Sequence, residues 1–451
     1  MFAKINFHDE FYQKLKLLVL PITMQQFMLA LVSATDAIML GAVSQTSLSA
    51  VSLAGQIQFV LNLFISGISA GSGIMAAQYW GKKDAASIEE VMPIALRTNL
   101  IFSGAFTVFA AVAPEVLMRI FTSDPALIES GAVYLRAVSL SYLLCGISQI
   151  YLILLKNTGY ATVSSRISCT AVVVNIICNA ILIYGLLGLP ALGIQGAAYA
   201  TVAARLVELI WSYLETKQSG RVQIIWKKMF HAADAVLTKD FWRYTTPVLG
   251  AALVWGIAYV SYSVIMGHMG SDAVAANSIT TIAKNMLSCL IRGVSGGAGV
   301  LIGNLLGAGE LDKAKVYGGR LTRMAIVVGM TTGGLLMLIS PLIVRFAPLS
   351  ETAAEYLQYM LIFCGCNIMA QSVNTTVLDG IFCAGGDMKG NLGAMWCFSV
   401  PFGFFAAFVL KWPVMVVYCI VNLDEIVKIP AVYLHYKKYI WVRNITVQED
   451  A

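Results

Sequence analysis

Charged residues are scarce in this sequence. Only 12% of its 451 residues are Asp, Glu, Lys or Arg, whereas 58% are hydrophobic. Soluble globular domains carry about a quarter charged residues, so this composition excludes a soluble fold. The apolar runs are also too long for barrel strands and do not alternate with polar residues. The sequence therefore predicts an all-α polytopic membrane protein that lies in a lipid bilayer.

Familiar catalytic and metal-binding motifs are also lacking. The sequence contains neither an HExxH zinc motif nor a P-loop, and it offers no pair of catalytic carboxylates. Its nine cysteines form no CxxC pair, which indicates packing residues rather than metal ligands or a disulfide framework. The net charge of +6 fits basic loops beside a membrane better than a nucleic-acid-binding surface. We expect no enzyme activity, no cofactor and no nucleic-acid partner.

Hydropathy predicts twelve membrane spans, because each of twelve apolar stretches reaches the roughly 20 residues needed to cross a bilayer. Lys and Arg gather at both chain ends and in every second connection, above all in residues 216–240. By the positive-inside rule, both termini and this connection are cytoplasmic, as in a multi-pass protein of the plasma (cytoplasmic) membrane. The predicted spans are 14–42, 50–76, 92–113, 131–155, 166–188, 193–215, 241–268, 276–302, 319–346, 353–383, 390–410 and 413–436.

The two halves of the chain repeat each other. One shift of 226 residues aligns Pro21 with Pro247 and the run Gly67–Gly73 with Gly293–Gly299. Small residues let membrane helices approach closely, but packing alone does not explain a single shift for both features. Six spans in each half imply two lobes related by an axis along the membrane normal. The predicted parts are an N-terminal six-helix lobe (1–215), a cytoplasmic linker (216–240) and a C-terminal six-helix lobe (241–451).

An acidic residue inside the first span is the strongest functional candidate. Asp36 lies in an otherwise apolar stretch, and an ionisable group there is costly enough to indicate a functional site. At the repeat shift Asp36 faces Tyr262, so the acid belongs to the N-terminal half alone, and we place ion coupling there. The alternative is that Asp36 merely pairs with a neighbouring helix. Pro21, earlier in the same span, removes a backbone donor and predicts a hinge.

Three neutral polar residues are expected at the depth of Asp36. Asn175 and Asn179 are four residues apart and share one face of the fifth span, while Thr201 lies in the outer half of the sixth. A carboxylate, two amides and a hydroxyl suit a hard cation such as Na⁺. They equally suit hydrogen bonding to a carboxyl group that takes up a proton. Both ions stay open, with a slight preference for H⁺, and simple interhelical hydrogen bonding is the alternative.

Polar residues in the C-terminal spans give weaker signals. Within the last span, Lys428 follows Asp424 and Glu425 by one turn, which predicts a structural ion pair. Four other residues are candidates for the lining of a water-filled substrate cavity, because polar groups are rare in spans. They are Tyr262, Lys284, Arg292 and Asp379. The alternative for the charged residues is that they pair with each other, and the span directions favour a pair of Arg292 with Asp379.

Taken together, these elements resemble those of the multidrug and toxic compound extrusion (MATE) transporters. The resemblance covers nearly the whole chain and rests on the order and spacing of its elements rather than on one motif. The elements are Pro21 with Gln25-Gln26, Asp36 to Gly41, Leu48-Ser-Ala50, Gly67–Gly73 with Gln78 and Gly81, Asn175 to Gly188 with Pro190 and Gly193, Gly196-Ala-Ala with Thr201, Pro247, Gly293–Gly299, and Asn304 to Gly307.

The resemblance implies a fold, an activity and a set of roles. It implies twelve helices in two lobes around a central cavity. It also implies export of cationic or amphipathic organic compounds in exchange for Na⁺ or H⁺. We expect the protein to be a monomer. Ion coupling would fall to Asp36 and bending to Pro21. The ion would also contact Asn175, Asn179 and Thr201.

The chain departs from this pattern at two places. Asn179 stands where many members have an aspartate, which removes one charge. The acids that one branch carries in its seventh and tenth spans are missing from Leu253-Val-Trp-Gly256 and from the region of Ser372. The nearest rival function is a lipid-linked sugar or polysaccharide flippase. A membrane enzyme and a channel are the alternatives from other classes.

Overall fold

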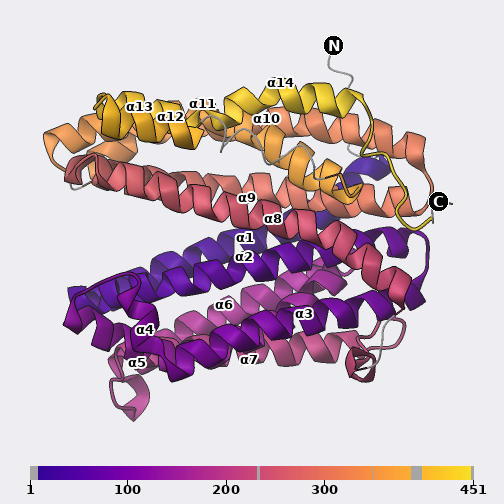
Figure 1. Cartoon of the computed structure of the whole chain (residues 1–451), viewed down its shortest axis with the longest axis horizontal. Coiled ribbons are helices and arrows are strands. Elements are labelled where there is room, and N and C mark those ends of the chain that lie inside the picture. Colours follow the sequence, from indigo (N-terminus) through magenta and orange to yellow (C-terminus); the bar gives the residue numbers. More distant parts are fainter. Residues whose placement is uncertain (1–8, 231–233, 348, 388–398, 448–451) are drawn as a thin grey trace. The chain divides into compact units, whose positions relative to one another are not determined.

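The computed structural model describes residues 9–230, 234–347, 349–387 and 399–447. These residues form helices and no strand (Figure 1). The elements are α1 (Glu10–Val43), α2 (Gln45–Gly81), α3 (Ala85–Val112), α4 (Pro114–Arg119), α5 (Pro125–Asn157), α6 (Ala161–Tyr184), η1 (Leu186–Gly188), α7 (Ile194–Thr216), η2 (Trp226–Phe230), α8 (Ala235–Gly267), α9 (Ser271–Gly307), α10 (Leu311–Phe346), α11 (Glu351–Thr375), η3 (Thr376–Phe382), α12 (Val400–Phe404), η5 (Phe405–Val409), α13 (Val414–Asn422) and α14 (Asp424–Lys437).

Nine helices within the described residues are long and apolar enough to cross a membrane. The segments α7, α12 with η5, and α13 with α14 match the other three of the twelve predicted spans. Three spans deviate from a plain α-helix: the tenth ends in the π-helix η3, the eleventh ends in the π-helix η5, and the twelfth is interrupted after Asn422. The chain ends, linker residues 231–233 and the first part of the eleventh span (390–398) lie outside the described residues.

Contacts group the chain into two compact units whose borders lie inside α1 and α8. Unit 1 comprises Met1–Gln26 and Leu253–Ala451, and unit 2 comprises Phe27–Ala252. In unit 2, α5 is the central helix and packs against α2, α3 and α7. In unit 1, α9, α10 and α11 pack against one another, and the first half of α1 joins their apolar core. The division into two lobes with a linker remains a prediction from the sequence repeat.

The glycine runs of the repeat allow close contact with the N-terminal halves of α1 and α8, the first helix of each repeat. In unit 2, a Cβ atom on Gly67 of α2 would lie 2.8 Å from the Cα atom of Leu249 in α8. In unit 1, a Cβ atom on Gly293 of α9 would lie 2.9 Å from the Cβ atom of Thr23 in α1. Real Cβ atoms do not approach so closely, so each position requires glycine. The 226-residue shift relates both members of these contacts, and the two first helices are therefore held in the same way.

The serines within these runs fit the letters GxSxG, which in some hydrolases mark a nucleophile. That role needs a sharp strand-to-helix turn that exposes the serine hydroxyl. Ser69 and Ser295 instead lie inside the helices α2 and α9 and are buried. The Ser295 hydroxyl donates a hydrogen bond to the carbonyl oxygen of Thr375 at 2.9 Å. The pattern here serves helix packing and not catalysis.

The described part of the linker is attached to unit 2. The indole of Trp226 in η2 donates to the Tyr151 hydroxyl at 2.7 Å, and Lys228 forms an ion pair of 2.5 Å with Glu90 of α3. The side chain of Val222 is buried as well. These contacts hold the described linker residues up to η2 against unit 2.

Candidate functional site

The carboxylate of Asp36 lies on the part of α1 that belongs to unit 2, and it is half-buried. The amide nitrogen of Asn179 in α6 donates to its Oδ1 atom at 2.6 Å. Asn179 itself is only 1% exposed. A hydrogen bond to a charged acceptor is one of the stronger side-chain contacts in proteins, typically about 1.5–3 kcal/mol. Asn179 therefore fixes the position of the acid.

Further hydrogen bonds extend from Asn179 to α7. Its amide nitrogen also donates to Asn175 Oδ1 at 3.0 Å, as expected for residues one helical turn apart. The Asn175 amide donates to Thr201 Oγ1 at 3.4 Å, and the Thr201 hydroxyl donates to the backbone oxygen of Ala197 at 3.0 Å. The structure thus brings together all four residues that the sequence singled out. Their role in ion coupling remains a prediction.

Local sequence explains why α6 and α7 meet at this point. Gly185 ends α6 in a left-handed conformation (φ 71°), which glycine adopts readily. After this turn the chain runs back alongside the end of α6, where the Leu192 amide donates to Leu182 O at 2.9 Å. A Cβ atom on Gly196 would lie 2.6 Å from the carbonyl carbon of Leu182, so only glycine allows α7 to approach α6 so closely. This approach places Thr201 beside Asn175.

The site has more hydrogen-bond acceptors than donors. Asn179 Oδ1 is buried and has no hydrogen-bond partner among the described residues. The acceptors that surround the site are therefore a carboxylate and amide and hydroxyl oxygens. Such a set can take up a proton on the carboxyl group, or it can hold a hard cation. Within the described residues no three His, Cys, Asp or Glu side chains gather as a transition-metal site would require.

Two tyrosines lie near Asp36 or contact its helix, and the sequence did not indicate either of them. The Tyr184 hydroxyl donates to the backbone oxygen of Met39 at 3.0 Å, which ties the C-terminal end of α1 to α6. Tyr134 of α5 is 8% exposed and lies within electrostatic range of Asp36. It belongs to an apolar cluster with Leu40. No local pattern marks either tyrosine, since their partners are distant in sequence.

Pro21 lies within a helix that continues on both sides of it. It is half-buried and sits between Val19 and Thr23, the residues that face the glycine run of α9. A proline in a helix interior removes one backbone hydrogen bond and weakens the helix there. The structure thus places the residue where bending of α1 would affect its contact with α9. The hinge itself remains a prediction.

The four residues predicted for the substrate cavity have different surroundings in unit 1. The Tyr262 hydroxyl donates to Asn277 Oδ1 at 2.5 Å. Lys284 is half-buried in α9. Arg292 is exposed, and its guanidinium donates to Asn285 Oδ1 at 3.4 Å. Asp379 is exposed on η3.

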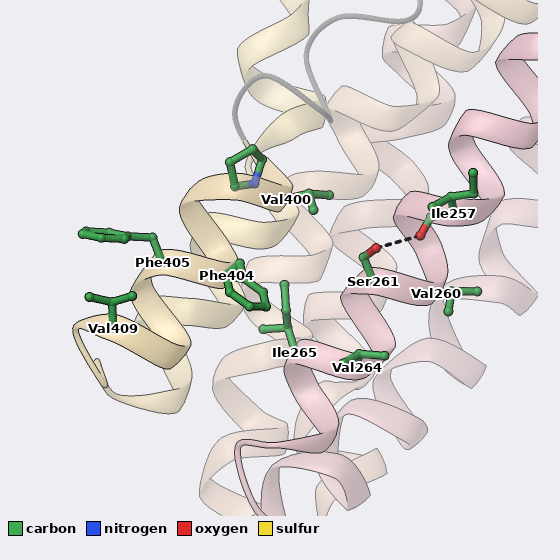
Figure 2. A pocket seen from close by; sticks show the side chains of 10 residues that line it. Ile257, Val260, Ser261, Val264, Ile265, Val400, Phe404, Phe405 and Val409 are labelled. Atoms are coloured by element: carbon green, nitrogen blue, oxygen red, sulfur yellow. Dashed lines mark hydrogen bonds between the residues drawn. The ribbon is translucent and has the colours of Figure 1, made fainter. Parts of the chain in front are cut away.

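A cavity of about 700 Å³ lies elsewhere in unit 1, and none of these four residues lines it. Figure 2 shows its walls, which come from α8 on one side and from α12 and η5 on the other. Its lining is apolar apart from Ser261, whose hydroxyl donates to the backbone oxygen of Ile257 at 2.9 Å. The cavity can accept a hydrocarbon group such as a lipid chain. It offers no charged partner to a ligand.

Comparison with known proteins identifies a family. The sequence model of the MatE family matches residues 21–181 and 247–409, one stretch in each half of the chain. The chain is 22% identical to the "Uncharacterized transporter YisQ" of Bacillus subtilis (strain 168) over 91% of its own length and 90% of that protein. It is 24% identical to the "Probable multidrug resistance protein NorM" of Bacillus cereus over 89% of its length and 90% of that protein.

Solved structures show the same fold. A crystal structure of a MATE protein in the straight conformation superimposes with a TM-score of 0.85 at 17% identity, covering 95% of this chain and 96% of the other. A MOP superfamily transporter from Pyrococcus furiosus Vc1 (DSM3638) gives a TM-score of 0.85 at 18% identity and covers 95% of both chains. A match of this extent includes both halves of the repeat.

Proposed function

Because the chain belongs to the MatE family of multidrug and toxic compound extrusion transporters, we propose that it is a secondary antiporter that exports cationic or amphipathic organic compounds in exchange for H⁺ or Na⁺. The observation that carries the proposal is the hydrogen-bonded chain from Thr201 through Asn175 and Asn179 to Asp36. It holds one acid inside a membrane span among neutral groups. An acid so placed can change its charge during transport.

The charges of the site favour a single monovalent cation. Asp36 supplies one negative charge, and Asn175, Asn179 and Thr201 are neutral. An unpaired carboxylate is costly in a low-dielectric site, whereas a protonated carboxyl group or a carboxylate with Na⁺ is neutral. Asn179 provides an amide where a second acid would bind a cation more strongly. We therefore favour H⁺ as the coupling ion, with Na⁺ as a competitor at the same oxygens.

The remaining predictions give a transport cycle. The six-helix lobes 1–215 and 241–451 alternate their access, and Pro21 lets α1 bend when Asp36 changes its charge. Tyr262, Lys284, Arg292 and Asp379 contribute to substrate handling in the other half. The protein acts as a monomer with both termini and the linker in the cytoplasm.

Separate ion gradients test the proposal. The purified protein is reconstituted into liposomes loaded with a fluorescent organic cation, and a proton gradient or a Na⁺ gradient is then imposed at zero membrane potential. We expect dye to move against its concentration gradient under the proton gradient, with external Na⁺ competing. Dye movement that only runs down its own gradient under both conditions would contradict an antiporter and favour a channel.

A further inference from the structure

The last membrane span is interrupted where it carries two acids. The helix α13 ends at Asn422 and α14 begins at Asp424, which is followed directly by Glu425. At the interruption, the Asn422 carbonyl oxygen accepts a hydrogen bond from the amide of Asn367 in α11 at 2.5 Å. The interruption covers only Leu423, whose backbone angles stay helical (φ −73°, ψ −13°), so the span is not a broken helix. Ionisable groups within spans are costly and indicate functional sites.

The acids face bases within the membrane span. The Lys428 ammonium lies 2.9 Å from Asp424 Oδ2 and 3.6 Å from Glu425 Oε1, and the side chains of Asp424 and Lys428 are 8% and 12% exposed. Lys284 of α9 lies within electrostatic range of Asp424. Asp379 of η3, an element that packs against α14, is exposed. The charges of Asp424 and Glu425 are therefore balanced by those of Lys428 and Lys284.

One face of α11 adds unpaired acceptors to this group. Asn367, Gln371 and Asn374 are spaced by four and three residues and thus lie on one helix face. The Asn374 amide donates to Glu425 Oε2 at 2.8 Å and to the Glu425 backbone oxygen at 2.6 Å. Yet Asn367 Oδ1, Gln371 Oε1 and Asn374 Oδ1 are buried and have no partner in the described parts of the chain. Asn367 and Asn374 are each only 2% exposed. A surplus of buried acceptors calls for a ligand that brings positive charge or hydrogen-bond donors.

We propose that these groups form a second site for the coupling cation, in the C-terminal half. The ligand class is a monovalent cation, H⁺ or Na⁺, bound by the carboxylates of Asp424 and Glu425 and by amide oxygens of α11. Lys428 is the internal cation that occupies the carboxylates when no ion is bound. When Asp424 takes up a proton, the Lys428 ammonium shifts its pairing to Glu425 and the group gains one positive charge. This proposal rests on the antiport function proposed above, in which the ion at Asp36 is required for export and the ion at the second site only adds to the exchange.

The repeat supports this location. Tyr262 stands where the N-terminal half has Asp36, so the C-terminal half lacks an acid at that point. The predicted spans place Asp424 in the sixth span of the second half (413–436), and Thr201 lies in the sixth span of the first half (193–215).

Ion stoichiometry tests the second site. In proteoliposomes at zero membrane potential, the logarithm of the steady dye ratio rises with the logarithm of the imposed ion ratio, and the slope gives the ions exchanged per dye. A proton-gradient series and a Na⁺-gradient series identify the ion. We expect a slope of two for the parent and for the control Glu355→Gln, an exposed acid of α11. We expect a slope of one for Asp424→Asn.

A paired substitution separates this role from a structural ion pair. If Asp424 only neutralises Lys428, the double variant Asp424→Asn with Lys428→Met removes both charges and restores the parent slope. If Asp424 binds the ion, the double variant keeps a slope of one even where the single variant folds poorly. A parent slope of one, or a parent slope restored in the double variant, would overturn the second site. The absence of any gradient-driven export by the parent would instead contradict the antiport proposal.

Discussion

At the scale of single residues, Asn179 decides how Asp36 is held. Its amide contacts both the acid and Asn175, so it connects the coupling residue to the rest of the polar chain. Thr201 lies at the far end, and its contact with Asn175 is longer at 3.4 Å. Asn179 and Thr201, which lie at opposite ends of this hydrogen-bonded chain, should therefore contribute unequally to gradient-driven export.

Substitution at these two positions tests that difference. We expect Asn179→Leu to lower gradient-driven export by about tenfold to a hundredfold, because it removes a hydrogen bond to a charged group. Thr201→Val, which keeps the shape of the side chain, should cost no more than about threefold, because it removes only a neutral contact. Initial rates of dye export per reconstituted protein measure both effects. Equal losses of export rate in the two variants would contradict the larger role assigned to Asn179.

Sequence reasoning could find this site because helix geometry is local. The four-residue spacing of Asn175 and Asn179 fixes a shared face before any tertiary contact is known. The contacts of Tyr184 with Met39 and of Tyr134 with the surroundings of Asp36 depend on tertiary packing and leave no local pattern. The cluster around Asp424 was expected only as an ion pair, because the sequence does not show that α11 faces it with unpaired oxygens.

At the scale of elements, the glycine runs set the closest helix contacts. Matching residues at one shift predicted the repeat, and hydropathy predicted the spans because it sums over many residues. It could not show that the first half of α1 packs in unit 1 and the first half of α8 in unit 2. The pattern of apolar residues in a span does not indicate which other helices that span contacts. Hydropathy also missed the interruption after Asn422, since the average hydropathy of a span does not show a local change in backbone hydrogen bonding.

Alanine at the repeat-related glycines tests the helix contacts. We expect Gly67→Ala and Gly293→Ala each to destabilise the protein by about 1–3 kcal/mol, because a methyl group would force α8 or α1 away. Gly104→Ala in α3 is the control, since a Cβ atom there meets nothing within 4 Å, and it should be neutral or slightly stabilising. Thermal unfolding in detergent measures the three variants. Unchanged melting of the first two would mean that the helices do not need this approach.

Bending at Pro21 is a second property of α1. Pro21→Ala restores a backbone donor and removes a steric clash, so it should straighten and stiffen the helix. We expect export to slow several-fold while thermal stability stays equal or rises. Export at the parent rate would exclude a necessary bend at this position.

At the scale of the whole molecule, the arrangement depends on which loops are cytoplasmic. The lysine and arginine bias predicts that the linker 216–240 faces the cytoplasm, and the structure leaves Lys217 exposed within it. A cysteine at position 217, in a background without accessible native cysteines, should react with a membrane-impermeant maleimide only after the cells are opened. Labelling of intact cells would invert the topology and with it the direction of transport.

The central claim is that Asp36 couples export to the ion gradient. Asp36→Asn keeps the size of the side chain, but it can neither take up a proton nor supply the charge that balances Na⁺. We predict that this variant, reconstituted at the parent level, binds the dye with similar affinity and fails to move it against a concentration gradient under either a proton or a Na⁺ gradient. Uphill dye export by Asp36→Asn under either gradient would contradict the account.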